Sequence, residues 1–313
     1  MNQNRRSNRV DYSVVVPVYN AEETLVSLFE GITSAFESLR KSFEVIFVDD
    51  GSKDQSWKVL TYLKKDYPEK VKAIRLAKNY GQHNAIFCGL SFVKESDVIT
   101  IDDDLQTPPE EIIKLIKKYE ETNADLVYGY YKRKKHNLWR NLGSKFLKKT
   151  SKTLYNAPGE GSSFKLIENK LVKDILNHYQ NFVYIDELFL WYTEDIAFVE
   201  VRHISRKGGG SGYTAGKLLR LFFNITIYYT AIPLKLMTAT GLIASLISFG
   251  FGVRFIIRKI FFDVPLGYTS MIVTILFSTS LILLSLGIIG EYLNRIYLVQ
   301  NKKPPYSIKK ILK

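Results

Sequence analysis

The chain has 313 residues, 46% of them hydrophobic and 24% charged, which suffices for one medium-sized domain and further segments. Its formal net charge of +13 suits a nucleic acid, an anionic membrane surface or a phosphorylated substrate as a partner. The single cysteine, Cys88, excludes an internal disulfide and a cysteine-based metal site, and the polar, basic N-terminal stretch MNQNRRSNRV predicts no signal peptide.

Predicted strands and helices alternate through the first 130 residues. Apolar, β-branched runs predict the strands, and apolar residues at i, i+3 and i+4 predict the helices between them. The expected strands are 13–18, 43–48, 71–76, 98–101 and 124–130, and the expected helices are 22–40, 55–65, 81–93 and 109–120. This alternation predicts an α/β fold with a mostly parallel sheet and helices on both of its faces.

The middle of the chain is less regular. Its expected elements are a helix over 139–155, a loop leading into a short strand over 159–167, a helix over 184–191, a strand over 197–204 and a flexible loop over 206–213. The next segment, 213–231, mixes basic and large apolar residues, and we expect an amphipathic helix at a membrane interface.

Two long uncharged runs, 236–253 and 264–290, predict transmembrane helices over 232–257 and 266–292. A pair of buried helices in a soluble protein is the alternative, but the runs are long and uniformly apolar. Basic residues flank both runs and favour cytoplasmic ends. We therefore expect a cytoplasmic catalytic domain over 1–212 and a cytoplasmic tail over 293–313.

Three consecutive carboxylates, Asp102, Asp103 and Asp104, follow the predicted strand 98–101. On an extended chain Asp102 and Asp104 point the same way and Asp103 points away. Mg²⁺ prefers a few carboxylates together with substrate phosphate oxygens. Asp102 and Asp104 are thus a candidate metal pair, and a solvated acidic turn is the alternative.

Two other predicted strands also end in candidate binding residues, the first at Pro17, Tyr19 and Asn20 and the second at Asp49 and Asp50. Ligands of parallel sheets bind beyond the carboxyl ends of the strands. The sequence contains neither the glycine-rich dinucleotide motif nor a P-loop. These observations favour a nucleotide held by strand-end carboxylates, with its phosphates on a metal. A soluble donor, the predicted membrane anchor and the basic charge suggest a lipid phosphate as acceptor.

Seven motifs carry a resemblance to a known family. They are VVVPVYNAEETL (14–25), VDDGSKD (48–54), KNYGQHNAIFCGL (78–90), IDDDLQTPPE (101–110), GSSFKLI (161–167), SRKGGGSGY (205–213) and GIIGEYLNRIY (287–297). The chain resembles the family 2 glycosyltransferases of the polyprenyl-phosphate type, which have the GT-A fold. That group includes dolichol-phosphate mannose synthases and bactoprenol glucosyltransferases. The first motif is widespread in the family, whereas DDDLQTPP and GEYLNRIY are much more specific.

The resemblance implies roles for individual residues. Those implied to bind the nucleotide are Pro17, Tyr19, Asp49, Asp50 and Lys78. Asp102 and Asp104 would hold Mg²⁺ or Mn²⁺ and the donor diphosphate and, with Gln106 beside the sugar, form the catalytic set. The residues implied to bind the acceptor phosphate are Arg140, Ser144 and Arg206. The sequence departs from the family pattern at Ala21, Lys78, Thr107 and Gly212.

The implied activity is inverting transfer of a hexose, with UDP-glucose as the expected donor, to undecaprenyl phosphate for cell-envelope glycan modification. A lipid phosphate is ionised at neutral pH, so its attack needs positioning and charge neutralisation rather than a general base. The expected setting is a bacterial plasma membrane, and the expected partners are the nucleotide sugar, the polyprenyl phosphate and the bilayer. A homo-oligomer, a flippase and a downstream glycosyltransferase are further candidate partners; nucleic acid is not expected.

Two alternatives stay open. A processive polysaccharide synthase would carry a Gln-x-x-Arg-Trp motif, but here Trp139 and Arg140 stand in the reverse order. The other alternative is a non-catalytic membrane adaptor that kept a nucleotide-sugar fold. The intact D-x-D of Asp102 and Asp104 argues against it. Metal-coupled binding of a nucleoside diphosphate would separate an enzyme from such an adaptor.

Overall fold

The structure is a computed structural model that describes residues 10–131, 160–177, 184–204, 267–300 and 304–312, with single residues between 237 and 261. The chain divides into two compact units. The first comprises Met1–Gly210 and Pro304–Lys313, and the second comprises Ser211–Lys303. The two units are described separately below.

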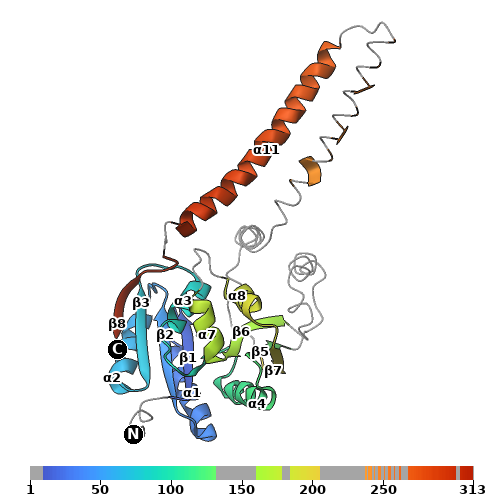
Figure 1. Cartoon of the computed structure of the whole chain (residues 1–313). Helices are drawn as coiled ribbons and strands as arrows, with labels where there is room; N and C mark the ends of the chain where they lie inside the picture. Colours follow the sequence, from blue (N-terminus) through green and yellow to red (C-terminus); the bar gives the residue numbers. More distant parts are fainter. Residues whose placement is uncertain are drawn as a thin grey trace, which may run out of the picture. The chain divides into compact units, whose positions relative to one another are not determined.

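The first unit is built on a β-sheet (Figure 1). Among the described residues this sheet has eight strands in the order β7-β5-β6-β4-β1-β2-β3-β8. Its strands are β1 (Tyr12–Val18), β2 (Phe43–Asp49), β3 (Val71–Leu76), β4 (Asp97–Thr100), β5 (Leu126–Tyr131), β6 (Glu160–Ile167), β7 (Ile196–Glu200) and β8 (Ile308–Leu312). β1 pairs in parallel with β2 and β4, β2 with β3, and β5 with β7.

The sheet is mixed, which corrects the prediction of a mostly parallel one. β6 lies between β4 and β5 and runs antiparallel to both, and β8 runs antiparallel to β3. Apolar periodicity predicts that a segment is a strand but not the direction in which the strand runs. A parallel pair needs a crossover connection, usually a helix, whereas an antiparallel pair does not, so no helix in the sequence indicates an antiparallel strand. The parallel core β4-β1-β2-β3 agrees with the expectation.

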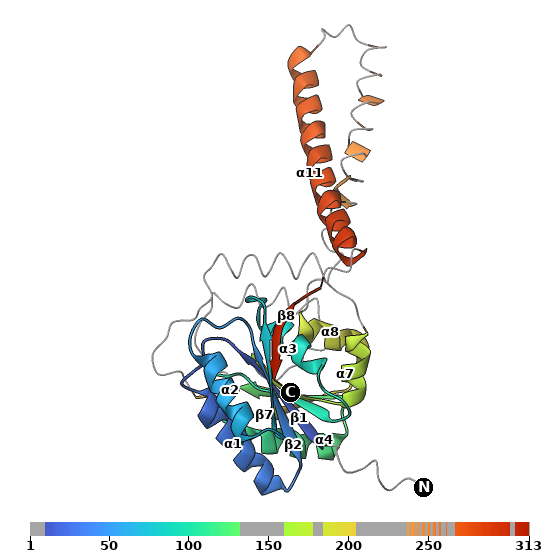
Figure 2. The ribbon, with the colours of Figure 1, turned by 90° about the vertical axis from the view of Figure 1, so that its left-hand side faces the viewer.

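Helices cover both faces of this sheet (Figures 1 and 2). They are α1 (Leu25–Leu39), α2 (Ser56–Asp66), α3 (Gln82–Leu90), the 3-10 helix η1 (Pro109–Glu111), α4 (Ile112–Thr122), α7 (Asn169–Leu176) and α8 (Ile185–Tyr192). Val14 and Val16 of β1 pack in one core cluster with α1, α2 and α4, whereas Val15 packs in the other with α3, α7 and α8. Alternate residues of a strand face opposite sides of the sheet, so both faces of β1 are buried.

The elements predicted up to residue 131 are present, with boundaries within a few residues of those expected. Two elements were missed, α7 and β8. The strand expected over 197–204 ends at Glu200, and the helix expected over 139–155 lies outside the described residues.

In the second unit, α11 runs over Tyr268–Gln300 and is 33 residues long. It begins near the start of the second predicted span, 266–292, and continues eight residues past its predicted end. Within it, Phe277–Asn294 is long and apolar enough to cross a membrane, and it is the one such helix among the described residues. The first predicted span, 232–257, and the amphipathic segment 213–231 lie largely or wholly outside those residues.

The last residues of the chain return to the sheet. Ser307 O accepts a hydrogen bond from Ala77 N at 2.8 Å, and β8 then pairs with β3, Ile311 opposite Ile74. Before the strand begins, the Tyr306 hydroxyl lies 3.2 Å from Ser91 Oγ. An unpaired edge strand exposes a row of backbone donors and acceptors, and β8 covers that row on β3.

Ile311→Ala should destabilise the first unit. Ile311 is half-buried against the cluster that contains Ile74, so the loss should be about 1–2 kcal/mol, below the value for a fully buried isoleucine. Thermal unfolding of the full-length protein in detergent would measure the change. Lys310→Ala, at the neighbouring exposed position, is the matched control, and equal midpoints for the two variants would contradict a stabilising role for β8.

Candidate active site

A cavity of about 270 Å³ opens beyond the carboxyl ends of β1, β2 and β4. Its walls come from the end of β1, the turn after β2, the segment leading into α3 and the acidic run after β4. The lining residues are Pro17, Val18, Tyr19, Asp50, Asn79, Gly81, Gln82, Asp102, Asp103 and Asp104. Four chain segments that are distant in sequence thus meet in one acidic pocket, as the rule for parallel sheets predicts.

The turn after β2 fixes one wall. Gly51 has a φ of +71°, and a Cβ atom there would lie 2.8 Å from the carbonyl carbon of Lys78, so only glycine fits. Asp50 accepts hydrogen bonds from Tyr80 N at 2.7 Å and Gly81 N at 2.8 Å. Burial raises the pKa of Asp50 to about 6 even though these two donors favour its charged form. Asp50 therefore holds the segment before α3 in place while it lines the cavity.

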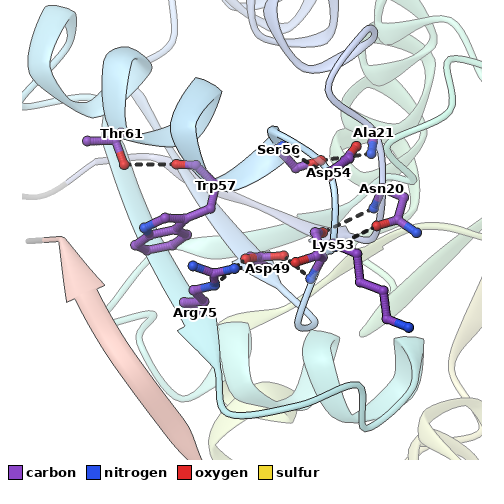
Figure 3. A network of polar contacts seen from close by, with 10 residues as sticks. Asn20, Ala21, Asp49, Lys53, Asp54, Ser56, Trp57, Thr61 and Arg75 are labelled. Carbon is purple, nitrogen blue, oxygen red and sulfur yellow. Dashed lines mark hydrogen bonds and ion pairs between the residues drawn. The ribbon is translucent and has the colours of Figure 1, made fainter.

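Asp49 lies beneath this turn and is absent from the cavity wall. Its side chain is fully buried, accepts a hydrogen bond from Ser52 N at 2.8 Å and lies 3.1 Å from Arg75 Nε (Figure 3). The guanidinium of Arg75 lies over the Trp57 ring, with its Cζ 5.5 Å from the ring centroid. In this arrangement the Asp49 carboxylate stabilises the turn, and its predicted contact with the nucleoside stays a prediction.

The loop after β1 is fastened to the turn after β2 by a second set of hydrogen bonds (Figure 3). Asn20 N donates to Ser52 Oγ at 3.0 Å, Asn20 Oδ1 accepts from Lys53 N at 2.9 Å, and Ala21 N donates to Ser56 Oγ at 2.9 Å. These bonds use backbone groups that would otherwise be unsatisfied in a loop. They fix the chain directly after Tyr19, which lines the cavity.

The acidic run after β4 forms a turn, with Leu105 at a φ of +58°. The expectation that Asp103 points away from the site is therefore wrong, because it assumed an extended chain. Asp103 lines the cavity, and its Oδ2 accepts a hydrogen bond from Tyr19 N at 2.9 Å. Its carbonyl oxygen also accepts from Thr24 Oγ1 at 2.5 Å. Asp103 thus joins the ends of β1 and β4.

Asp102 receives hydrogen bonds on both carboxylate oxygens. Gln82 Nε2 donates to Oδ1 at 2.6 Å, and Ser163 Oγ of β6 donates to Oδ2. Asp104 Oδ1 accepts from Gln106 N at 3.1 Å. Each ionised carboxylate oxygen has further lone pairs, so these contacts orient the groups without exhausting their capacity as ligands.

The electrostatics of the acidic turn suit a cation. Burial raises the pKa of Asp102, with Asp104 adding to the rise, and burial with both neighbouring carboxylates raises the pKa of Asp103 to about 7. No group of three His, Cys, Asp or Glu side chains arranged for a metal occurs among the described residues. Mg²⁺ and Mn²⁺ do not require one, since Mg²⁺ typically keeps waters and phosphate oxygens beside one or two carboxylates. The donor set of Asp102 and Asp104 fits such an ion.

The remaining predicted residues are placed less directly. Lys78 is exposed, with its Nζ 5.2 Å from the Tyr80 ring centroid. Gln106 follows the cavity-lining run, and its carbonyl oxygen accepts a hydrogen bond from Ile204 N at 2.8 Å. Arg140, Ser144 and Arg206 lie outside the described residues.

Sequence reasoning missed the residues that support Asp102. Gln82 and Ser163 stand in the quoted motifs, but their proximity to Asp102 depends on the position of α3 and on β6 pairing with β4. Two residues beyond Ser163, on the same face of β6, the buried Lys165 forms an ion pair with Asp186 of α8. The Tyr128 hydroxyl donates to the same carboxylate at 3.0 Å. A buried lysine requires such a partner, and this contact ties α8 to the sheet.

The fold and the acidic cavity define a GT-A type nucleotide-sugar domain. Residues 13–176 match the family model described as "Glycosyl transferase family 2". The match covers more than half of the chain, which therefore belongs to glycosyl transferase family 2 and is a glycosyltransferase.

Two similar proteins match this chain over most of their length. The chain is 29% identical over 306 residues to the undecaprenyl-phosphate 4-deoxy-4-formamido-L-arabinose transferase of Klebsiella pneumoniae (strain 342), covering 96% of this chain and 93% of that protein. It is 30% identical over 308 residues to the enzyme of the same name from Yersinia pestis (strain Pestoides F), with the same coverage. The crystal structure of glucosyl-3-phosphoglycerate synthase from Mycobacterium tuberculosis with phosphoglyceric acid matches 70% of this chain and 78% of that one, at 17% identity and a TM-score of 0.50. This last likeness concerns the fold alone.

Asp103→Ala should weaken binding of a nucleoside diphosphate in the presence of Mn²⁺. The substitution removes the acceptor for Tyr19 N, and a hydrogen bond to a charged group contributes about 1.5–3 kcal/mol, so we expect a loss of about tenfold or more. Asp103→Asn keeps an acceptor oxygen and should lose much less. Calorimetric titration with UDP would measure both. Equal affinities of the wild-type protein and Asp103→Ala would contradict the link between the two loops.

Proposed function

We propose that this glycosyltransferase transfers a sugar from a UDP-sugar to a polyprenyl phosphate, giving a lipid-linked phosphosugar for cell-envelope glycan modification. The observation that carries the proposal is the convergence of Asp102, Asp103 and Asp104 with the Tyr19 loop in one cavity at the strand ends. The names of the full-length relatives support undecaprenyl phosphate as the acceptor.

In this proposal the nucleoside lies along Pro17, Tyr19 and Asp50, with its diphosphate toward the acidic turn. Asp102 and Asp104 would hold a divalent cation, which supplies positive charge against the leaving diphosphate when it is bound. The sequence resemblance favours glucose as the sugar. The relatives' name adds 4-deoxy-4-formamido-L-arabinose as a second donor sugar to test.

The reaction forms a bond between an acceptor phosphate oxygen and the anomeric carbon and breaks the bond from that carbon to the diphosphate. In-line displacement inverts the anomeric configuration. The phosphate is already an anion, so the residues of the chain act by orienting two negatively charged groups. Arg140, Ser144 and Arg206 are proposed to hold the acceptor phosphate, because arginine can donate two parallel hydrogen bonds to an oxyanion pair.

The proposal includes a membrane anchor of two spans, 232–257 and 266–292. The segment Ser211–Lys303 leaves the first unit at one end and rejoins it at the other. A segment whose two ends belong to one compact unit must cross the bilayer an even number of times. With basic residues flanking both runs, we place the catalytic unit and both termini in the cytoplasm of a bacterium.

Purified full-length protein given undecaprenyl phosphate, Mg²⁺ or Mn²⁺ and single donors should yield one lipid-linked sugar, identified by mass spectrometry. The donors are UDP-glucose, UDP-4-deoxy-4-formamido-L-arabinose and GDP-mannose. Asp104→Asn should lower the rate by about 100-fold or more, because charge neutralisation at the leaving group is lost. Asp174→Asn, on an exposed face of α7, is the control. Absence of a product with every donor, or equal rates for the two variants, would refute the assignment.

Cysteine labelling of intact cells tests the topology. Cys88 is buried, so the wild-type background should be low. Thr269→Cys, near the connection between the proposed spans, should react with an impermeant reagent added outside. Ser38→Cys, exposed on α1, should react only after permeabilisation. The reverse pattern would place the catalytic unit outside the cytoplasm.

A further inference from the structure

The residues that follow β7 are fastened to the acidic turn. Val201 N donates to Tyr130 O at 3.0 Å, and Ile204 N donates to Gln106 O at 2.8 Å. Ile204 thus bonds to the residue proposed to lie beside the donor sugar, two positions before Arg206. The backbone of residues 201–204, which lead into the motif 205–213, is therefore held by the donor side of the site.

Glu111 of η1 binds the same segment. Its Oε1 accepts from Arg202 Nε at 2.6 Å, and its Oε2 accepts from Arg202 N at 3.3 Å and pairs with Lys114 Nζ at 2.6 Å. The Glu111 side chain is only 2% exposed, whereas that of Arg202 is 65% exposed. One buried carboxylate thus holds both the backbone and the side chain of a residue that otherwise faces solvent.

A buried carboxylate is unfavourable unless charged donors satisfy it. Burial opposes ionisation of Glu111, yet the hydrogen bonds from Lys114 and Arg202 lower its pKa below the usual value, so it stays charged at neutral pH. A second contact fixes the neighbouring residue, since the rings of His203 and Tyr131 lie 4.4 Å apart and the Tyr131 hydroxyl lies 2.6 Å from Thr107 Oγ1.

We propose that Glu111 and Arg202 form a positioning pair that holds residues 201–204, which lead into the motif 205–213, against the donor turn at Gln106. The pair thereby sets the distance between the acceptor phosphate and the donor sugar. The inference rests on the proposed function, because it takes Arg206 as an acceptor residue. Neither Glu111 nor Arg202 lines the cavity, so the pair acts on acceptor use and leaves nucleotide binding unaffected.

The test is Glu111→Gln in the full-length protein, because glutamine keeps the size of the side chain and removes the charge. Amide hydrogen exchange over 201–206 should quicken about tenfold or more, as expected for the loss of a charged hydrogen bond. The KM for undecaprenyl phosphate should rise to a similar extent, and the affinity for UDP with Mn²⁺ should change less than twofold. Glu110→Gln is the control, since Glu110 is 59% exposed and lies 3.9 Å from Arg202 Nη2.

Arg202→Ala should reproduce both effects, and Arg202→Lys should restore part of the acceptor response. Arg202 is on the surface, so its variants keep the test decisive if Glu111→Gln folds poorly. Unchanged exchange over 201–206, or faster exchange with an unchanged KM for the lipid, would overturn the inference. Arg140→Ala and Arg206→Ala test the acceptor assignment separately. If they leave the lipid KM unchanged, the proposed acceptor site fails, while the exchange data still decide whether the pair fixes the loop.

Discussion

Carboxylates at the ends of parallel strands need hydrogen-bond donors when they are buried. In this protein the backbone amides of neighbouring loops are those donors. Asp50 accepts hydrogen bonds from the backbone amides of Tyr80 and Gly81, and Asp103 accepts one from the backbone amide of Tyr19. Each contact satisfies a buried charge and fixes a loop on the neighbouring strand. The charge that the site requires for chemistry is thus also what gives the cavity its shape. A cation at Asp102 and Asp104 would act on carboxylates that these contacts have already oriented.

The central strands and their helices could be predicted because each is a local pattern. Val14 and Val16 belong to one face of β1 and Val15 to the other, and a short apolar run is enough to indicate such a strand. The contact between Asp102 and Ser163 could not be predicted, because it depends on β6 entering the sheet beside β4 in the antiparallel direction. The direction of Asp103 was mispredicted because a turn replaced the extended chain. Arg140, Ser144 and Arg206 lie outside the described residues, so the binding roles implied for them stay predictions.

β8 shows why a terminal strand escapes sequence patterns. The run Ile308–Leu312 contains two lysines among three aliphatic residues and was expected to be part of a basic tail. Lys309 and Lys310 are exposed, while the aliphatic residues are half-buried, Ile308 and Ile311 against one core cluster and Leu312 against the other. Charged side chains on an edge also discourage pairing with other chains. The strand thus makes the residues after Ser211–Lys303 part of the sheet of the first unit.

The chemistry of the proposed acceptor would make positioning matter more here than proton transfer. A hydroxyl acceptor would require a base within hydrogen-bond reach of it, whereas a phosphate arrives ionised. The remaining barrier comes from bringing two anions together and aligning the attacking oxygen with the leaving diphosphate, which well-oriented groups can lower by several kcal/mol. Small displacements between the two substrate sites would therefore reduce the rate strongly. The proposed positioning pair of buried Glu111 and exposed Arg202 would meet this requirement from outside the cavity, where it leaves the walls free for substrate.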